Sequence, residues 1–269
     1  MPRRLLAALT IIPMLAVAPA PSAEPAPAVE GALKLRVTYD GVLLVKVLDM
    51  SIDQEISPAG FEAHATLKSS GILALFKKID VQAGSEGRIV AAQPQPIAFS
   101  HVNNDGQYNR RVRVNWTPAD VATWTSVAYP SPGDPAPTRS QKLAASDPLT
   151  ALTRIAMSPA GKAPCAADSM LFDGRQLYRL RFGDPRARSL SDHERRLGLT
   201  GAVRCALTFS EIAGFDRKAA DKKNMGLGDT PVSIDLARTT ETGPWVITAI
   251  RGHTPLGEAR IVIRDLKAS

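Results

Sequence analysis

Cysteine, histidine and aromatic residues are scarce in this chain. Its 269 residues include two cysteines and four histidines, and only 5% of the residues are aromatic. A protein metal site normally needs three or four ligands at close spacing, and neither cysteine has such neighbours. Nucleic-acid binding requires clustered basic residues with aromatic partners, whereas the 33 lysines and arginines are scattered. The composition therefore predicts no metal site and no nucleic-acid partner.

Catalytic signatures are missing as well. The sequence has no Gly-x-Ser-x-Gly elbow, no His-Glu-x-x-His pair, no phosphate-binding glycine loop and no dinucleotide fingerprint. We therefore expect no cofactor, assign no catalytic residue and predict that the protein is not an enzyme. The least ordinary polar group is the run Asp192-His193-Glu194.

Long hydrophobic runs are absent after the first 23 residues. Arg3 and Arg4 precede an apolar run over residues 5–17, and small residues follow to Ala23, which is the layout of a cleaved signal peptide. The run has about 13 residues, fewer than the roughly 20 that a membrane-spanning helix needs. We therefore expect export with cleavage after Ala23 and no transmembrane segment in the mature chain. A flexible leader is expected over 24–32 and a single β-rich envelope domain over 33–269.

Alternating hydrophobic and polar residues dominate the mature chain. Leu33, Leu35 and Val37 alternate with polar residues, as in a strand with one buried face. The alternation recurs, so the predicted fold class is mainly β, with a single antiparallel sheet curved into an open barrel or spiral. Turns are predicted at 39–41, 57–60, 104–106 and 254–257. Strands are predicted over 33–38, 42–56, 61–67, 81–83, 87–92, 97–103, 108–116, 168–182, 202–212, 232–237, 246–251 and 258–265.

One short helix is predicted near residues 147–157. Asp147 can cap its first turn, Pro148 suits the first helical position, and Leu149 and Ile155 lie at helical spacing. The apolar stretch 68–80 fits either a short helix or a buried crossing segment, because periodicity alone cannot separate the two.

A charged face and a disulfide are the two further features of the sequence. Arg111 and Arg113 alternate with apolar neighbours, which predicts an arginine-bearing strand face, either solvated or lining a polar cleft. Cys165 and Cys205 are predicted to form a disulfide that staples a hairpin. Such bonds persist in oxidising compartments, and closing a loop of about 41 residues stabilises by roughly 4 kcal/mol in the chain-entropy model. Asp173-Gly174, inside that loop, fits a bulge or a turn.

Three segments of the chain resemble a known family when taken in order. They are the run from Leu67 to Asp80, the run from Ser146 to Leu152, and the run from Leu171 to Leu180. Together they resemble the bacterial envelope family called domain of unknown function 3108. The resemblance implies an exported, β-rich protein of Gram-negative envelopes, with an open, spirally wound sheet around a short helix. It carries over no catalytic residues.

These observations predict a non-enzymatic periplasmic protein that supports cell-envelope integrity. Its partners would be envelope proteins, a lipid or a cell-wall component. The candidate ligand or partner surface comprises Arg111, Arg113, Asp173, Arg175 and Tyr178. A carrier of a lipid or other apolar ligand in a β-barrel cavity is the first alternative. The second is an envelope hydrolase that uses acidic residues between Asp168 and Asp192, and its candidate residues are Asp173, Asp192, His193 and Glu194.

Overall fold

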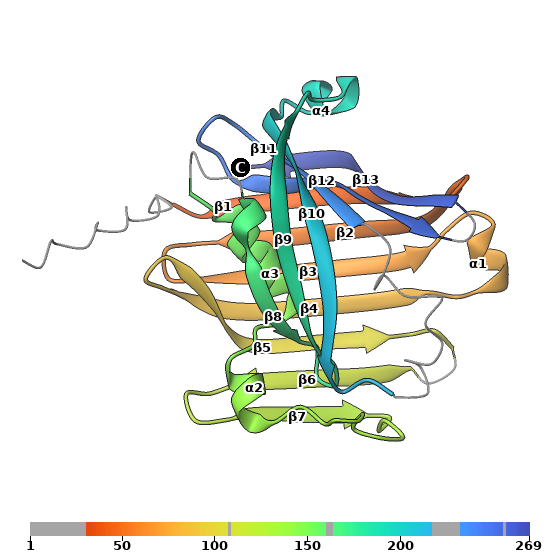
Figure 1. The fold of residues 1–269 in the computed structure, drawn as a ribbon, viewed down its shortest axis with the longest axis vertical. Helices are drawn as coiled ribbons and strands as arrows, with labels where there is room; N and C mark the ends of the chain where they lie inside the picture. Colours follow the sequence, from red (N-terminus) through yellow and green to blue (C-terminus); the bar gives the residue numbers. More distant parts are fainter. Residues whose placement is uncertain (1–30, 107–108, 160–163, 217–231, 255–256) are drawn as a thin grey trace, which may run out of the picture.

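The protein folds as one large antiparallel sheet, as the sequence predicted (Figure 1). The computed structural model describes residues 31–106, 109–159, 164–216, 232–254 and 257–269. The first seven strands are β1 (Leu33–Val42), β2 (Lys46–Ile56), β3 (Gly60–Ser69), β4 (Asp80–Val90), β5 (Gln93–Asn103), β6 (Arg110–Trp116) and β7 (Val121–Ser126). The others are β8 (Asp168–Phe172), β9 (Leu177–Arg188), β10 (Thr200–Ala213), β11 (Val232–Arg238), β12 (Trp245–Thr254) and β13 (Gly257–Ala268).

The first and last strands meet in the middle of the sheet. The strand order is β7-β6-β5-β4-β3-β2-β1-β13-β12-β11-β10-β9-β8. From β1 the chain winds outward to β7, crosses to the far edge at β8 and winds back to β13. Strands β8 to β10 then cross over the concave face of β1 to β7 (Figure 1). The edge strands β7 and β8 do not pair with each other in the described chain, so the sheet is curved but open.

The first strand shows how the alternation produces this sheet. Leu35, Val37 and Tyr39 are buried and face the concave side, while Lys34 and Arg36, which alternate with them, are exposed. The turn predicted at 39–41 is wrong, because β1 continues to Val42 and the chain reverses at residues 43–45. The turn was predicted because glycine favours turns. Gly41 instead lies in the strand, where a Cβ added to it would lie 2.6 Å from the Cβ of Leu48.

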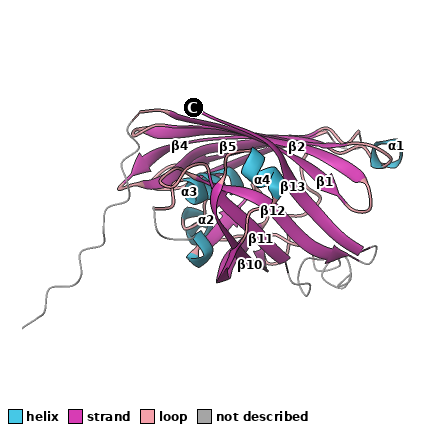
Figure 2. Cartoon of the chain, turned by 90° about the horizontal axis from the view of Figure 1, so that it is seen from above, coloured by secondary structure: helices cyan, strands magenta, loops and turns pink. Residues whose placement is uncertain are grey.

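The predicted helix is α3 (Pro148–Ala156), which lies against the concave face of the sheet (Figure 2). Asp147 caps it, because its Oδ1 accepts hydrogen bonds of 2.9 Å from the amides of Leu149 and Thr150. Its Oδ2 accepts another from Ser85 of β4 at 3.0 Å. The sheet and the helix start are thereby joined through one fully buried carboxylate, and burial raises the pKa of Asp147.

Three further α-helices, all shorter than α3, lie in the described part of the chain. The 68–80 stretch contains α1 (Leu73–Phe76), which has no buried residue, so it is a short exposed helix and the buried crossing segment is wrong. The connection between β9 and β10 contains α4 (Asp192–Arg196). The sequence reading missed β7 and α2 (Arg139–Leu143). Both are too short to establish a period, although α2 begins with a capping box between Thr138 and Gln141.

The disulfide joins Cys165 and Cys205, as predicted, but it does not staple one hairpin. Cys165 lies in the 3-10 helix η1 (Pro164–Ala166), which contacts β9 and β10, and Cys205 lies in β10. Residues 168–182 form two strands, β8 and the start of β9, so of the two alternatives for Asp173-Gly174 the turn is confirmed and the bulge is wrong. The strands predicted at 81–83 and 87–92 are one strand, β4, with an irregularity after Glu86.

Some predictions fall outside the described residues. The predicted signal peptide (1–23), most of the leader (24–32) and the centre of the turn at 254–257 lie there. In the part of the chain that the structure describes, no helix has the length and hydrophobicity required to cross a membrane.

Candidate functional site

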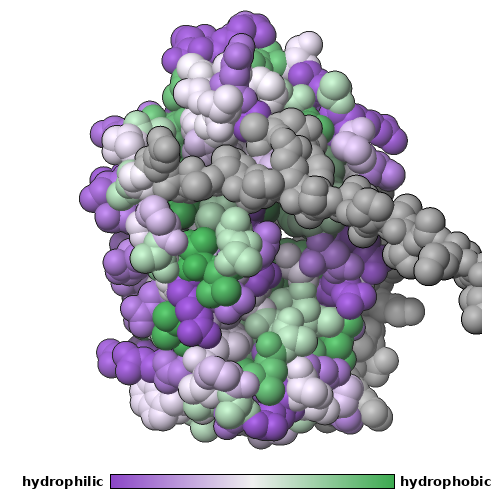
Figure 3. Space-filling model, turned by 90° about the vertical axis from the view of Figure 1, so that its left-hand side faces the viewer, coloured by the Kyte–Doolittle hydropathy of each residue, from purple (hydrophilic) through white to green (hydrophobic). Residues whose placement is uncertain are grey.

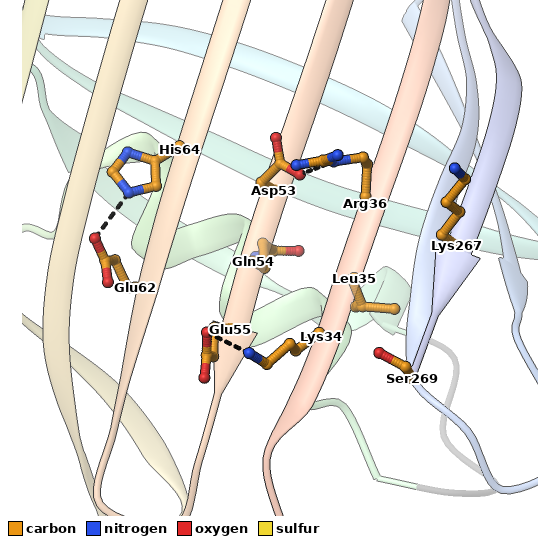
Figure 4. Close-up of a pocket in the computed structure, with 10 residues that line it drawn as sticks. All are labelled: Lys34, Leu35, Arg36, Asp53, Gln54, Glu55, Glu62, His64, Lys267 and Ser269. Carbon is orange, nitrogen blue, oxygen red and sulfur yellow. Dashed lines mark hydrogen bonds and ion pairs between the residues drawn. The ribbon is translucent and has the colours of Figure 1, made fainter.

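The outer face of β1 to β3 carries charged residues in compensating pairs (Figure 4). Lys34 lies 3.2 Å from Glu55, Arg36 pairs with Asp53, and His64 lies 2.8 Å from Glu62. These pairs surround a shallow hollow of about 380 Å³. Because all three pairs are largely exposed, solvent screens them and each contributes little to stability. We interpret this face as the solvated side of an antiparallel sheet.

A second polar cluster surrounds Asp235 in β11, which is 2% exposed. Arg204 forms a two-point ion pair with it at 2.6 and 2.9 Å, and Arg251 lies 3.3 Å from its Oδ2. Next to it, Arg188 binds both oxygens of Glu194 at 2.8 and 2.5 Å. We call these five residues the Asp235 cluster; it borders a cleft of about 480 Å³.

Arginines fix the protonation state of the Asp235 cluster. Burial alone would raise the pKa of Asp235, but its hydrogen bonds with Arg204 and the charges of Arg188 and Arg251 lower it. Burial would also raise the pKa of Glu194, but hydrogen bonds, chiefly from Arg188, lower it to about 2. Both carboxylates are therefore ionised and already neutralised by arginine. The cluster is built to hold α4 against the sheet, with little charge left for a ligand.

The acidic residues that the hydrolase alternative would use are also engaged in ion pairs or hydrogen bonds. Asp192 pairs with Arg195 within α4, and Glu194 both binds Arg188 and accepts the backbone amide of Ser191 at 2.8 Å. Asp173 accepts two backbone amides of its own turn. A general acid needs a raised pKa, whereas that of Glu194 is lowered. Within the described ranges, no three His, Cys, Asp or Glu residues are placed to hold a metal ion.

The third cluster lies at the opposite end of the β9–β10 pair, near α2 and β7 (Figure 1). Its cleft of about 350 Å³ is centred on Tyr129, and we call it the Tyr129 cleft. Lys142 and Arg175 are the two charged residues that line it, and both are cationic. The other lining residues are Thr123, Thr125, Ala128, Tyr129, Ser131, Pro132, Ala136, Pro137, Phe172 and Gly174.

Arg175 is aimed into this cleft by the turn between β8 and β9. Oδ1 of Asp173 accepts the amides of Arg175 and Gln176 at 2.9 and 2.7 Å. Gly174 has a φ of +101°, and a Cβ there would lie 2.3 Å from Cγ1 of Val112 in β6. Only glycine allows both this backbone conformation and this approach. The Asp173-Gly174 pair therefore presses the turn against β6 and fixes the position of the next residue.

Two guanidinium groups lie over the Tyr129 ring. The Cζ atoms of Arg110 and Arg175 are 4.0 and 4.9 Å from its centroid. Arg110 also donates to the backbone carbonyl of Val127 at 2.9 Å. Burial raises the pKa of the Tyr129 hydroxyl, and the nearby carboxylate of Asp173 raises it further. The uncharged Tyr129 ring thus positions the guanidinium groups of Arg110 and Arg175 by cation–π contacts.

The proline-rich loop over 130–137 forms the wall of the cleft. The amide of Gly214 donates to the carbonyl of Pro135 at 2.8 Å, which joins this loop to the end of β10. Asp216 then accepts from Arg175 at 2.6 Å and from Ser131 at 3.1 Å. Asp216 is half exposed, so it holds Arg175 at the rim and neutralises it only in part. Lys142 lies 5.3 Å from the Phe172 ring and has no ion-pair partner among the described residues.

The structure divides the predicted ligand or partner surface between two faces of the sheet. Arg111 and Arg113 point outward from β6, opposite the buried Val112 and Val114. Asp173 and Arg175 lie on the concave side at the Tyr129 cleft.

The last residue of the predicted surface, Tyr178, is not at the cleft. It stacks on Phe209 of β10 at 5.4 Å between ring centroids, and burial raises its pKa. These five residues therefore do not form one surface. Arg110, Tyr129 and Lys142 were not identified from the sequence. The one signal for any of them was that Arg110 lies on the same strand face as Val112, which pointed to the concave side.

A small cavity lies between α3 and the sheet. It is lined by residues that include Tyr39, Leu152 and Trp245 and has a volume of about 20 Å³. That is close to the space of a single water. An acyl chain does not fit in it without repacking of the core.

Comparisons with known proteins identify the fold. No family model matches the sequence, and no curated protein matches it. The chain is similar to the crystal structure of a β-barrel-like protein of domain of unknown function 1849 from Brucella abortus. The TM-score is 0.51 and the sequence identity 12%, over 88% of this chain and 98% of that one. At that identity the similarity shows the fold alone.

A candidate lipoprotein from Parabacteroides distasonis is a more distant match. Its TM-score is 0.28 at 11% identity, over 90% of this chain and 97% of that one, and we base no argument on it. The resemblance to domain of unknown function 3108 is not confirmed. The comparison does show that this β-rich fold occurs in a bacterial domain of unknown function.

Proposed function

We propose that this chain is a non-enzymatic periplasmic protein that supports cell-envelope integrity by binding an anionic envelope component in the Tyr129 cleft. The observation that carries the proposal is the charge of the lining residues. Lys142 and Arg175 face the same cleft with no carboxylate among the lining residues, and three hydroxyls of Thr123, Thr125 and Ser131 accompany them. Cations with hydroxyl groups suit a carboxylate or a phosphate.

Two features of the sequence support the envelope location. The first 23 residues have the layout of a signal peptide, and the Cys165–Cys205 disulfide requires an oxidising compartment. The bacterial β-barrel-like neighbour fits this proposal through its fold. The alternative function, a carrier of an apolar ligand, has less support than this proposal because the cavity between α3 and the sheet is so small.

Gene deletion with complementation tests the proposed function. We expect the deletion strain to be more sensitive to detergent and to cell-wall antibiotics, and the wild-type gene to restore resistance. A Lys142→Glu/Arg175→Gln variant should restore it at most partly, because the cleft loses its cations. Lys34→Ala/Arg36→Ala removes two cations from the outer face and should restore it fully. Circular dichroism of each variant checks folding.

Two results would contradict the proposal. If deletion leaves resistance to all these stresses unchanged, the protein does not support the envelope. If the Lys142→Glu/Arg175→Gln variant is folded and complements as well as wild type, the Tyr129 cleft is not the site.

A further inference from the structure

Two neighbouring loops at one end of the sheet expose an apolar surface. They are the β1–β2 turn (residues 43–45) and the segment that contains α1, which projects from the right-hand edge in Figure 1. Leu44, Leu75 and Phe76 are 87%, 81% and 81% exposed. Val45 and Ile72 beside them are 55% and 57% exposed. We call these five residues the apolar tip.

The backbone holds the two loops of the tip together. The amide of Ser70 donates to the carbonyl of Val47 at 2.8 Å. Gly71 has a φ of +54°, and a Cβ there would lie 2.5 Å from the carbonyl oxygen of Lys46. The close approach therefore depends on glycine, and it places residues 72–76 beside the β1–β2 turn. The exposed side chains form one built surface rather than separate loop ends.

Lysines border the tip. Lys77 and Lys78 directly follow α1, are exposed, and have no ion-pair partner in the described part of the chain. Lys46 is already neutralised, because it lies 2.9 and 2.6 Å from Asp40 and Asp49. The uncompensated charge at the tip is therefore positive and comes from two adjacent lysines.

The shape of the tip selects its partner. Side chains exposed by more than four-fifths protrude from the molecule, so the tip is convex. A specific protein interface needs roughly 1,000 Å² or more of matched surface, which a tip of five residues does not offer. At the opposite end of the molecule, Figure 3 shows hydrophobic patches between hydrophilic residues. Protruding apolar side chains beside lysines match the interface of a bilayer that contains anionic lipid.

We propose that the apolar tip docks this protein on the surface of an anionic membrane. Leu44, Leu75 and Phe76 enter the interface between headgroups and acyl chains, while Lys77 and Lys78 bind lipid phosphates. This inference shares with the proposed function only the exported location and does not depend on the Tyr129 cleft. It gives the described part of the chain, in which no helix is long and apolar enough to cross a membrane, a means of reaching one.

Vesicle cosedimentation of the mature chain, residues 24–269, tests the tip. We expect binding to phosphatidylethanolamine vesicles that contain phosphatidylglycerol and little binding to phosphatidylcholine vesicles. Leu75→Ser/Phe76→Ser should weaken the partition coefficient at least about tenfold, because two large apolar side chains no longer enter the interface. Lys77→Glu/Lys78→Glu should weaken it by about fivefold or more per lysine.

Matched controls separate the tip from general surface effects. Trp124→Ser removes an apolar side chain of β7 that is 57% exposed, and Arg111→Glu/Arg113→Glu reverses two outward charges on β6. Both should bind these vesicles as wild type does. The outer-face variant Lys34→Ala/Arg36→Ala removes two exposed cations and should also bind normally.

A second measurement reports insertion directly. In a Phe76→Trp variant, brominated phospholipid should quench the added fluorescence, whereas quenching of the wild-type tryptophans should be weaker. The proposal is overturned if wild type fails to bind the phosphatidylglycerol vesicles, or if the tip variants bind as wild type does. Dimerisation that Leu75→Ser/Phe76→Ser abolishes, without vesicle binding, would identify a second copy as the partner instead.

Discussion

The β9–β10 pair carries an arginine cluster at each end, and the two clusters are built differently. In the Asp235 cluster, Arg204 and Arg188 each bind a carboxylate through two contacts. In the Tyr129 cleft, Arg110 and Arg175 lie over an uncharged ring. The carboxylates of the Asp235 cluster are almost fully buried, whereas Asp216, which pairs with Arg175, is half exposed and neutralises Arg175 only in part. We therefore assign stability to the first cluster and binding to the second.

The largest expected effect comes from removing the buried carboxylate of the Asp235 cluster. Asp235→Asn keeps the shape of the side chain but leaves Arg204, Arg188 and Arg251 without their shared anion. Breaking a buried ion pair costs about 3–5 kcal/mol, so the free energy of unfolding should fall by about that amount in urea denaturation. Asp53→Asn, on the exposed pair with Arg36, should lower it far less, because solvent screens that pair. Equal effects would remove the distinction between buried and exposed pairs.

The disulfide should stabilise the Asp235 end of the molecule more than the Tyr129 end. Cys165 and Cys205 pack with Ile234 and Leu236, which flank Asp235 in β11. The Cys165→Ser/Cys205→Ser variant should lose about 2–5 kcal/mol of unfolding free energy. Hydrogen exchange should show faster exchange in β10 and β11 before β6 and β7. Faster exchange that begins in β6 and β7 would contradict this assignment.

Acid should weaken the Asp235 cluster through Glu194. The pKa of Glu194 is lowered in the folded protein to about 2 from an ordinary value near 4.5. A lowered pKa stabilises the fold above the ordinary pKa, and this contribution is lost as the pH falls toward 2. We expect it to amount to roughly 1–3 kcal/mol. Denaturation at several pH values measures this. As the pH falls toward 2, the free energy of unfolding of Glu194→Gln should decrease less than that of the wild type. An equal decrease in both proteins would contradict the role assigned to Glu194.

The smallest effect on stability is expected at Tyr129. Tyr129→Leu removes the ring over which Arg110 and Arg175 lie and should cost about 1–2 kcal/mol. Tyr129→Phe keeps the ring and should change the free energy of unfolding by less than about 0.5 kcal/mol. Denaturation of both variants provides the measurement. A larger cost for Tyr129→Phe would mean that the hydroxyl matters more than the ring.

The strands and the main helix could be predicted because their signals are local. Alternation placed β1, β2 and β3, and Asp147 with Pro148 placed the start of α3. The turn at 39–41 was misplaced for a physical reason. Glycine at position 41 fits a turn but also fits a strand in which a neighbour, here Leu48, approaches closely.

The candidate site could be predicted only in part because it is assembled from distant segments. Asp173 and Arg175 belong to one turn motif and were found from the sequence. Arg110, Tyr129 and Lys142 come from β6, a loop and α2, and only the folded sheet brings them to that turn. The pairing of Arg188 with Glu194 was missed for the same kind of reason, because Glu194 was read together with its neighbour His193 rather than with a partner on β9.

Arginine Nε–Hε spectra from nuclear magnetic resonance test most directly whether the Tyr129 cleft, and not the Asp235 cluster, binds an anion. Residues 24–269 would be titrated with N-acetylmuramic acid as a carboxylate probe and, separately, with inorganic phosphate. We expect saturable shifts at Arg175 and Arg110, while Arg188 and Arg204 stay fixed in the same sample. Shifts confined to Arg188 and Arg204, or no saturable shift at Arg175 with either probe, would contradict the assignment of binding to the Tyr129 cleft.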